Sequence, residues 1–133
     1  MRFLDTNLLI HYFTRDDEGK AQKVLGLLKR VERNEERVIT SSLVIFETVF
    51  TLQSFYKVSR KKIKKLVSPI LELRGLKLLD KEIYQLALDI YVKKNISFAD
   101  AFNTAFILKK EIKEIYSYDE DFDRIEEIRR MLP

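Results

Sequence analysis

Short apolar stretches and longer amphipathic stretches alternate along the chain. Runs rich in β-branched or aromatic residues predict strands at 1–4, 38–40, 76–79 and 114–117. Between them, apolar residues recur every three or four positions, which predicts helices that bury one side. Strands that alternate with helices favour a parallel sheet with right-handed crossovers. The pattern therefore predicts an α/β fold, a three-layer α/β/α sandwich with a central and mainly parallel sheet.

Capping residues and helix breakers define the expected helix ends. A short helix is expected at 7–13, before a polar break at 15–19. Pro69 is expected to kink or split its helix, and the tail at 125–132 fits either a last helical turn or an edge strand. The other helices are expected at 20–31, from Ser41 or Ser42 to Tyr56, from Ser59 to Gly75, from Asp80 to Asn95, and from Ser97 to Lys110.

Composition narrows the classes of fold and function. The 133 residues suffice for one domain, 1–133, and a hydrophobic content of 46% excludes disorder. The chain has no cysteine, so any metal must be held by oxygen atoms or by His11, the single histidine. A net charge of +4 permits a nucleic-acid partner without requiring one. Neither a leader peptide nor an apolar run of about 18 residues is present, so we expect a soluble, cytoplasmic protein without a membrane partner.

Asp5 is the first acid at a position suited to chemistry. It follows the first predicted strand and precedes Thr6 and Asn7. Open parallel sheets bind ligands beyond the carboxyl ends of their strands, so a carboxylate here is suited to a site. Aspartate is also a common N-cap, and capping of the next helix explains Asp5 about as well.

Glu47 lies within an almost entirely apolar stretch, 43–50. We expect this helix to be buried, where an unpaired carboxylate would be strongly destabilising or would stay protonated. No basic residue lies one turn away to pair with it. A functional role is therefore the favoured explanation for Glu47, and a buried basic partner from another part of the chain is the alternative.

Asp100 is the third candidate. Ser97 and Asp100 match a capping box, and this alone explains both residues. Asn103 and Thr104 lie one turn further on, so the polar residues form a stripe on an otherwise apolar helix. A polar stripe that faces inward indicates a site.

Asp119 follows the fourth predicted strand. The two-residue period of a strand puts Ser117 and Asp119 on the same side. Asp121 and Asp123 are close by, so the sequence leaves open whether Asp119 or Asp121 completes a site. An acidic surface turn explains this stretch equally well when it is considered alone.

The four acids have related positions in the predicted fold. Each follows a strand or opens a helix after a strand or crossover, so all can meet at the carboxyl edge of one parallel sheet. Clustered carboxylates repel one another unless a cation neutralises them, and oxygen ligands suit Mg²⁺ or Mn²⁺. Such a cluster is what metal-dependent hydrolysis of phosphodiester bonds requires. The expected site contains Asp5, Glu47, Asp100 and Asp119.

Four short stretches resemble the acidic motifs of PIN domains, in the same order along the chain. They are 3–7, 41–47, 97–105 and 117–122. The resemblance covers essentially the whole chain, and single-domain PIN proteins of this length are most often VapC-like toxins. It implies a Mg²⁺-dependent endoribonuclease that cleaves RNA, forms a homodimer and is inhibited by a VapB-like antitoxin. It also implies an acidic quartet of Asp5, Glu47, Asp100 and Asp119, supported by Thr6, Asn7, Asn103 and Ser117.

Two other functions stay open, a housekeeping RNA-processing PIN nuclease and a non-catalytic PIN-like interaction module. The glycines are scattered, which excludes a Gly-rich phosphate loop. His11 has no partner set by a motif, so we interpret it as a packing or surface residue. The basic run 57–65 is interpreted as a solvated helix face rather than as an RNA contact.

Overall fold

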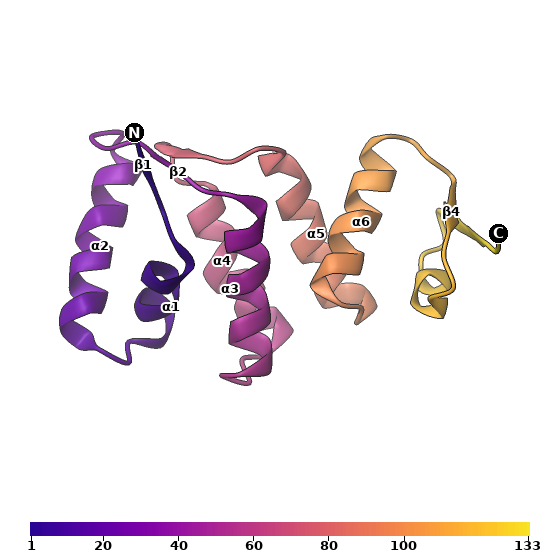
Figure 1. The fold of residues 1–133 in the computed structure, drawn as a ribbon, viewed down its shortest axis with the longest axis horizontal. Coiled ribbons are helices and arrows are strands. Elements are labelled where there is room, and N and C mark those ends of the chain that lie inside the picture. Colours follow the sequence, from indigo (N-terminus) through magenta and orange to yellow (C-terminus); the bar gives the residue numbers. More distant parts are fainter. The chain divides into compact units, whose positions relative to one another are not determined.

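Two units make up the fold in the computed structural model, which describes residues 1–133. Unit 1 is Met1–Leu79 and unit 2 is Asp80–Pro133. Each unit has its own parallel sheet and its own helices. Figure 1 shows unit 1 in indigo to rose and unit 2 in salmon to yellow.

The sheet of unit 1 contains three parallel strands in the order β1-β2-β3. The Leu4 amide donates to the Ile39 carbonyl at 2.8 Å, and this bond continues the pairing beyond β1. The Thr40 amide donates to the Lys77 carbonyl at 3.1 Å and does the same for β2. The carboxyl edge of the sheet therefore lies directly before Asp5. The strands are β1 (Arg2–Phe3), β2 (Val38–Ile39) and β3 (Leu76–Lys77).

Four helices share one core with these strands. They are α1 (Thr6–Thr14), α2 (Glu18–Glu32), α3 (Ser42–Ser54) and α4 (Arg60–Leu71). α1 lies beside α2, and α3 lies beside α4 (Figure 1). Burial of each large apolar side chain stabilises the unit by roughly 1.5–3 kcal/mol. The buried cluster is formed by Leu4, Leu9, Val24, Leu28, Val31, Val38, Val44, Ile70 and Leu76.

Side-chain caps begin three of these helices. Asp17, Ser41 and Ser59 each accept a hydrogen bond from the backbone amide three residues further on, at 3.0, 3.4 and 3.2 Å. Of the two expected caps for α3, Ser41 is the one observed. The cap at Asp17 was not predicted, and it starts α2 at Glu18, earlier than the apolar pattern suggested.

One expectation about unit 1 is wrong in part, and another is wrong. Pro69 does not split its helix, because α4 continues through it to Leu71. A proline so close to the end of a helix removes only one of the last hydrogen bonds. Gly75 does not end a helix. It lies just before β3, where a Cβ atom would collide with the carbonyl oxygen of Glu36, so only glycine permits this close approach.

Unit 2 contains two helices followed by two short strands. α5 and α6 lie side by side (Figure 1), and Tyr91 packs edge-on against Phe98 with ring centroids 5.7 Å apart. β4 pairs in parallel with β5, so the tail is an edge strand rather than a helical turn. The elements are α5 (Lys81–Lys94), α6 (Phe98–Lys109), β4 (Glu114–Tyr116), the 3₁₀ helix η1 (Glu120–Arg124) and β5 (Arg129–Met131).

The helix ends of unit 2 agree with the sequence at three of four positions, and α6 ends at Lys109 with Lys110 as its C-cap, as expected. Ser97 caps α6 and accepts from the Asp100 amide at 3.1 Å. Asn95 ends α5 in the left-handed conformation, with φ 54°, which asparagine tolerates. The capping role predicted for Asp80 is wrong, because its φ is 56° and its side chain makes no capping bond. An N-cap needs an extended backbone to aim its side chain at the helix amides.

All strand pairs in both units are parallel. The predicted α/β class with parallel strands is confirmed. The prediction that 1–133 forms a single domain stays a prediction. None of the helices has both the length and the apolar character that crossing a membrane would require.

Candidate active site

Asp5 stands at the end of β1 with an exposed carboxylate. Its backbone occupies the N-cap position of α1, with φ −93° and ψ 159°, yet its side chain makes no capping hydrogen bond. The residue before it is held by Thr40, whose buried hydroxyl donates to the Leu4 carbonyl at 2.8 Å. Helix capping therefore does not explain the Asp5 carboxylate, which stays available for a ligand.

Glu47 lies on the exposed side of α3. Leu43 and Phe50, one turn before and after it, are 71% and 69% exposed. The expectation that Glu47 is buried is wrong, because an apolar sequence does not tell which side of a helix its neighbours cover. The side that α3 buries is formed by Val44, Ile45, Thr48, Val49 and Leu52.

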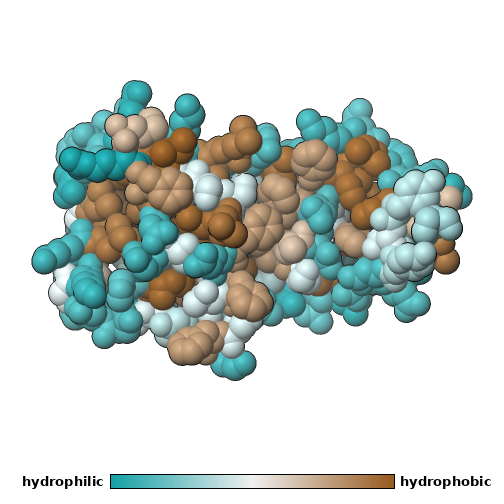
Figure 2. All heavy atoms as spheres, viewed as in Figure 1, coloured by the Kyte–Doolittle hydropathy of each residue, from teal (hydrophilic) through white to brown (hydrophobic).

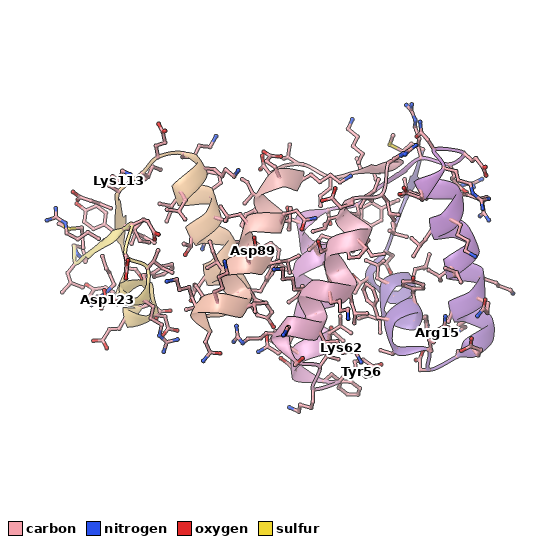
Figure 3. The ribbon with its side chains drawn as sticks, turned by 180° about the vertical axis from the view of Figure 1, so that it is seen from behind. Arg15, Tyr56, Lys62, Asp89, Lys113 and Asp123 are labelled. Atoms are coloured by element: carbon pink, nitrogen blue, oxygen red, sulfur yellow. The ribbon has the colours of Figure 1, made fainter.

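Asp5 and Glu47 line one open pocket of unit 1, with a volume of about 420 Å³. Figure 3 shows Tyr56, another residue of its wall, where the chain turns from α3 toward α4, at the same end of this helix pair as Lys62. The structure brings together the predicted residues of unit 1. The wall of the pocket is formed by Asp5, Thr6, Asn7, Ile10, His11, Asp16, Glu47, Thr51 and Tyr56.

Unit 2 gathers a second set of acids. Asp100, Asp119 and Asp121 each offer one carboxylate oxygen, and these oxygens all lie within 4.8 Å of one another. Asp119 and Asp121, the two alternatives left by the sequence, therefore both belong to the cluster. Asp123, labelled in Figure 3, is instead paired with Arg130, which donates to its two carboxylate oxygens at 3.0 and 3.1 Å. This ion pair lowers the pKa of Asp123.

Hydrogen bonds to the backbone shape the acidic turn of unit 2. The Asp119 amide donates to the Ser117 hydroxyl at 3.0 Å. The Asp121 amide donates to the Asp119 carboxylate at 2.9 Å. Arg130 donates to the Ser117 carbonyl at 3.2 Å. Ser117 therefore helps to orient the backbone that carries Asp119.

The polar stripe expected on α6 is only partly present. Asp100 is half-buried, and Asn103 is exposed one turn further on. Thr104 is fully buried, and its hydroxyl donates to the Asp100 carbonyl at 2.8 Å. Thr104 therefore satisfies the helix backbone instead of facing a ligand.

The surroundings of Asp100 raise its pKa above the usual range for aspartate. Burial contributes most, and the nearby charge of Asp119 comes next, while a hydrogen bond with Ser97 acts in the opposite direction. The charge of Asp121 raises the pKa further. Without a cation, the cluster therefore disfavours full ionisation of its carboxyl groups.

The sequence did not reveal the roles of three residues near the candidate site, Thr40, His11 and Asp16. Thr40 is the last residue of a predicted strand, and this position was the one available signal. His11, interpreted as packing or surface, hydrogen bonds to Asp16 at 2.7 Å, five residues further on. Helical periodicity pairs residues three or four apart, so no pattern connects these two across the break after α1.

The donor atoms of both acidic groups are oxygens. Three carboxylates in unit 2 and three in the pocket of unit 1 form the set, beside the hydroxyl of Thr6 and the amide of Asn7. Hard oxygen donors of this kind fit a divalent cation such as Mg²⁺, Mn²⁺ or Ca²⁺ rather than a thiophilic metal. The residues present therefore fit a hard divalent cation.

Comparison with known proteins identifies the family. The sequence profile of the PIN domain matches residues 2–128. The chain belongs to the PIN-domain family, which confirms the predicted PIN-like α/β sandwich. It is similar to a VapC ribonuclease of Aquifex aeolicus, with 28% identity over 127 residues that cover 94% of this chain and 92% of the relative. Among solved structures it is similar to VapC20 of Mycobacterium tuberculosis, a toxin that cleaves the sarcin–ricin loop, with 20% identity, a TM-score of 0.42, and coverage of 96% of this chain and 97% of that one.

Proposed function

We propose that this protein is a VapC-like toxin, an endoribonuclease that hydrolyses RNA phosphodiester bonds with a divalent cation, Mg²⁺ or Mn²⁺. The observation that carries the proposal is the position of the acids. In each unit a carboxylate follows the end of a parallel strand, Asp5 after β1 and Asp119 after β4. Membership of the PIN-domain family and similarity to a VapC ribonuclease support the same activity.

The proposal includes the acidic quartet expected from the sequence and a single PIN domain over residues 1–133. Asp119 is proposed as the ligand from this turn, because it is the acid nearest the end of β4. Asp121 supports Asp119 through the hydrogen bond from its amide, at 2.9 Å. The proposed ligands are Asp5, Glu47, Asp100 and Asp119.

The chain's polar residues would orient these ligands and the RNA. A divalent cation in such a site lowers the pKa of a bound water and offsets the charge that develops on the phosphate. Thr6 and Asn7 line the pocket beside Asp5, and Ser117 holds the backbone of Asp119. Asn103, exposed one turn after Asp100, is assigned a contact with the RNA.

A VapB-like antitoxin and a second copy of the chain are the proposed protein partners. Leu43, Phe50 and Phe55 of unit 1 are 71%, 69% and 75% exposed. Figure 2 shows hydrophobic side chains, in brown, at the surface over α3. Grouped apolar side chains on a surface often mark a protein interface. Light scattering that shows only monomer at micromolar concentration would contradict the homodimer. Because cellular RNA is the proposed substrate, we expect the protein to act in the cytoplasm.

Cleavage of RNA by the purified protein tests the proposed activity. We expect cleavage with Mg²⁺ or Mn²⁺ and none with EDTA. Asp5→Asn and Asp100→Asn should each lose about 100-fold or more in rate, because each removes a charge that holds the cation. Glu35→Gln and Glu126→Gln, which neutralise exposed carboxylates that belong to neither acidic group, should keep wild-type activity. Full activity in either aspartate variant would contradict the proposal.

Growth of a bacterial host separates a toxin from a housekeeping nuclease. Expression of the wild-type chain should arrest growth, and co-expression of a small reading frame adjacent to its gene should relieve the arrest. Asp5→Asn, expressed to the same level, should not arrest growth. Normal growth with the active wild-type enzyme would instead favour the housekeeping nuclease.

A further inference from the structure

His11 and Asp16 form a hydrogen-bonded pair in the wall of the unit 1 pocket. The His11 Nδ1 lies 2.7 Å from an Asp16 carboxylate oxygen. His11 belongs to α1, and Asp16 to the turn that joins α1 to α2. Both residues line the same pocket as Asp5 and Glu47. The pair is therefore part of the candidate active site and not of the core.

Asp16 determines how the imidazole is oriented and where it carries its proton. The hydrogen bond with His11 lowers the pKa of Asp16 below its ordinary value of 3.8, so this carboxylate is ionised at neutral pH and only accepts hydrogen bonds. The proton between the two groups therefore sits on Nδ1. Nε2, on the other side of the ring, makes no hydrogen bond with the protein and is left for a ligand.

The charges in the pocket limit which ligands Nε2 of His11 can bind. His11 is the one basic side chain in the wall, while Asp5, Asp16 and Glu47 are acidic. Carboxylates repel an anion and cannot donate a hydrogen bond to it. An RNA phosphate that enters this pocket therefore meets a charged donor only at His11, through a protonated imidazole.

We propose that His11 binds the RNA substrate, and that its protonated imidazole donates a hydrogen bond from Nε2 to a phosphate oxygen beside Asp5 and Glu47. Asp16 is a positioning residue that holds the ring through Nδ1. The inference rests on the proposed ribonuclease function and adds to it a phosphate contact outside the acidic quartet. Contacts of this kind set the register of a nucleic acid on its protein.

Charged groups on the elements packed against α1 surround His11. α1 packs against α2 and α3. The wild type and a His11 variant contain the same charged groups around residue 11, so the ratio of their kcat/KM values reports the contribution of the imidazole alone. On the pocket side the groups are Asp5, Asp16, Glu47 and Tyr56, and from α2 they are Lys20, Lys23 and Arg30, which line a second cavity of about 470 Å³ together with His11.

The kinetics of His11→Gln are the first test. We expect kcat/KM to fall about 10- to 100-fold at pH 6, mainly through KM, because a charge-assisted hydrogen bond is lost. A loss in kcat with an unchanged KM would contradict a contact that binds the substrate.

Asp16→Asn tests the positioning role. We expect a smaller loss in kcat/KM at pH 6, about 3- to 10-fold, because the ring is still present but is less well held. In the His11→Gln background, Asp16→Asn should add almost nothing, since the two residues act through one contact. Glu35→Gln is the matched control, because it removes an exposed carboxylate of the same unit and should keep the wild-type kcat/KM.

NMR of the imidazole reports the contact without cleavage. The chain has a single histidine, so the ring signals of histidine-labelled protein belong to His11 alone. In the Asp100→Asn variant, an RNA decamer centred on a mapped cleavage position should shift the Cε1 and Nε2 signals. The same decamer with a neutral methylphosphonate at that position should shift them much less, because it lacks the charged acceptor.

The outcomes separate this inference from the proposed function. If the wild type cleaves RNA and Asp5→Asn does not, while His11→Gln keeps full kcat/KM at pH 6, the phosphate contact is wrong and the ribonuclease stands. Ring signals that stay in place while backbone amides of the pocket respond to the decamer would overturn it too, as would equal shifts with the methylphosphonate. If the wild type neither cleaves nor binds RNA, both proposals are wrong.

Discussion

The acids of unit 1 and unit 2 are held in different ways. In unit 1, Asp5 and Glu47 are exposed and share an open pocket from separate elements. In unit 2, oxygens of Asp100, Asp119 and Asp121 lie within 4.8 Å of one another, in a turn shaped by backbone hydrogen bonds. Unit 2 therefore contains repulsion that a cation would relieve, and this repulsion raises the pKa of Asp100 further than burial alone.

The two groups of acids also differ in their surroundings. Unit 2 concentrates negative charge in a compact cluster. Unit 1 has an open pocket of about 420 Å³, with a polar wall that includes the amide of Asn7 and the imidazole of His11. Substitutions in each group test how strongly its role depends on charge.

The largest effect is expected when Asp5→Asn and Asp100→Asn are compared singly and in one double variant. Each single substitution is expected to lower kcat/KM by about 100-fold or more, and the double substitution little further, because groups that serve one cation act as a unit. Steady-state cleavage of one RNA substrate at fixed Mn²⁺ measures this. Losses that multiply in the double variant would mean that the two units act independently.

Asp119→Asn and Asp121→Asn test which of these two acids of unit 2 is the metal ligand. We expect a loss of about 100-fold in kcat/KM for Asp119→Asn and at most about 10-fold for Asp121→Asn, since only Asp119 is proposed as a ligand. Circular dichroism should show that both variants stay folded. The reverse order of losses would make Asp121 the ligand.

Thermal unfolding without metal should reveal the repulsion at Asp100. The pKa of Asp100 is raised, mainly by burial and then by Asp119, so above pH 3.8 the folded chain binds more protons than the unfolded chain. The free energy of unfolding therefore falls as the pH rises through this window, and it stays lower above it. At pH 7 in EDTA, Asp100→Asn should unfold about 1–3 °C above the wild type, and near pH 3.5 this advantage should vanish.

Asp123→Asn is the matched control for this measurement. Its hydrogen bond with Arg130 lowers the pKa of Asp123, so its ionised form stabilises the fold above its ordinary pKa, and this contribution is lost as the pH falls through the lowered value. Asp123→Asn should therefore unfold below the wild type at pH 7. If both variants shifted in the same direction at pH 7, the distinction between the paired and the clustered acids would be wrong.

The smallest effects on the free energy of unfolding are expected when one helix-capping serine in each unit is replaced. Ser97 accepts from its helix at 3.1 Å and Ser41 at 3.4 Å. Ser97→Ala should lower the free energy of unfolding by about 1 kcal/mol, and Ser41→Ala by about 0.5 kcal/mol, because the longer bond is the weaker one. Urea denaturation followed by circular dichroism measures both. A larger loss for Ser41→Ala would contradict this ranking.

Local signals made most of the fold predictable from the sequence. The caps at Ser59 and Ser97 act on amides only three residues away, so a short stretch of sequence contains both partners. Parallel pairing followed from the alternation of strands and helices. The positions of Asp5 and Asp119 were predictable for the same reason, since each comes shortly after a predicted strand.

Contacts between distant elements were not predictable in this way. The exposure of Glu47 depends on which side of α3 is covered, and its own apolar stretch contains no such information. The bond between His11 and Asp16 crosses a helix end, where periodicity stops. Gly75 meets the carbonyl oxygen of Glu36, a collision that only the folded chain reveals.

Calorimetric titration with Mn²⁺ tests most directly the central proposal that Asp5 and Asp100 are both metal ligands. The wild type should bind Mn²⁺, and Asp5→Asn and Asp100→Asn should each weaken the affinity by about 10-fold or more, because each removes a ligand of the same ion. The matched controls Glu35→Gln and Glu126→Gln should bind as the wild type does. Wild-type affinity in Asp5→Asn, with the loss confined to Asp100→Asn, would show that unit 2 binds the ion alone and would contradict the proposal.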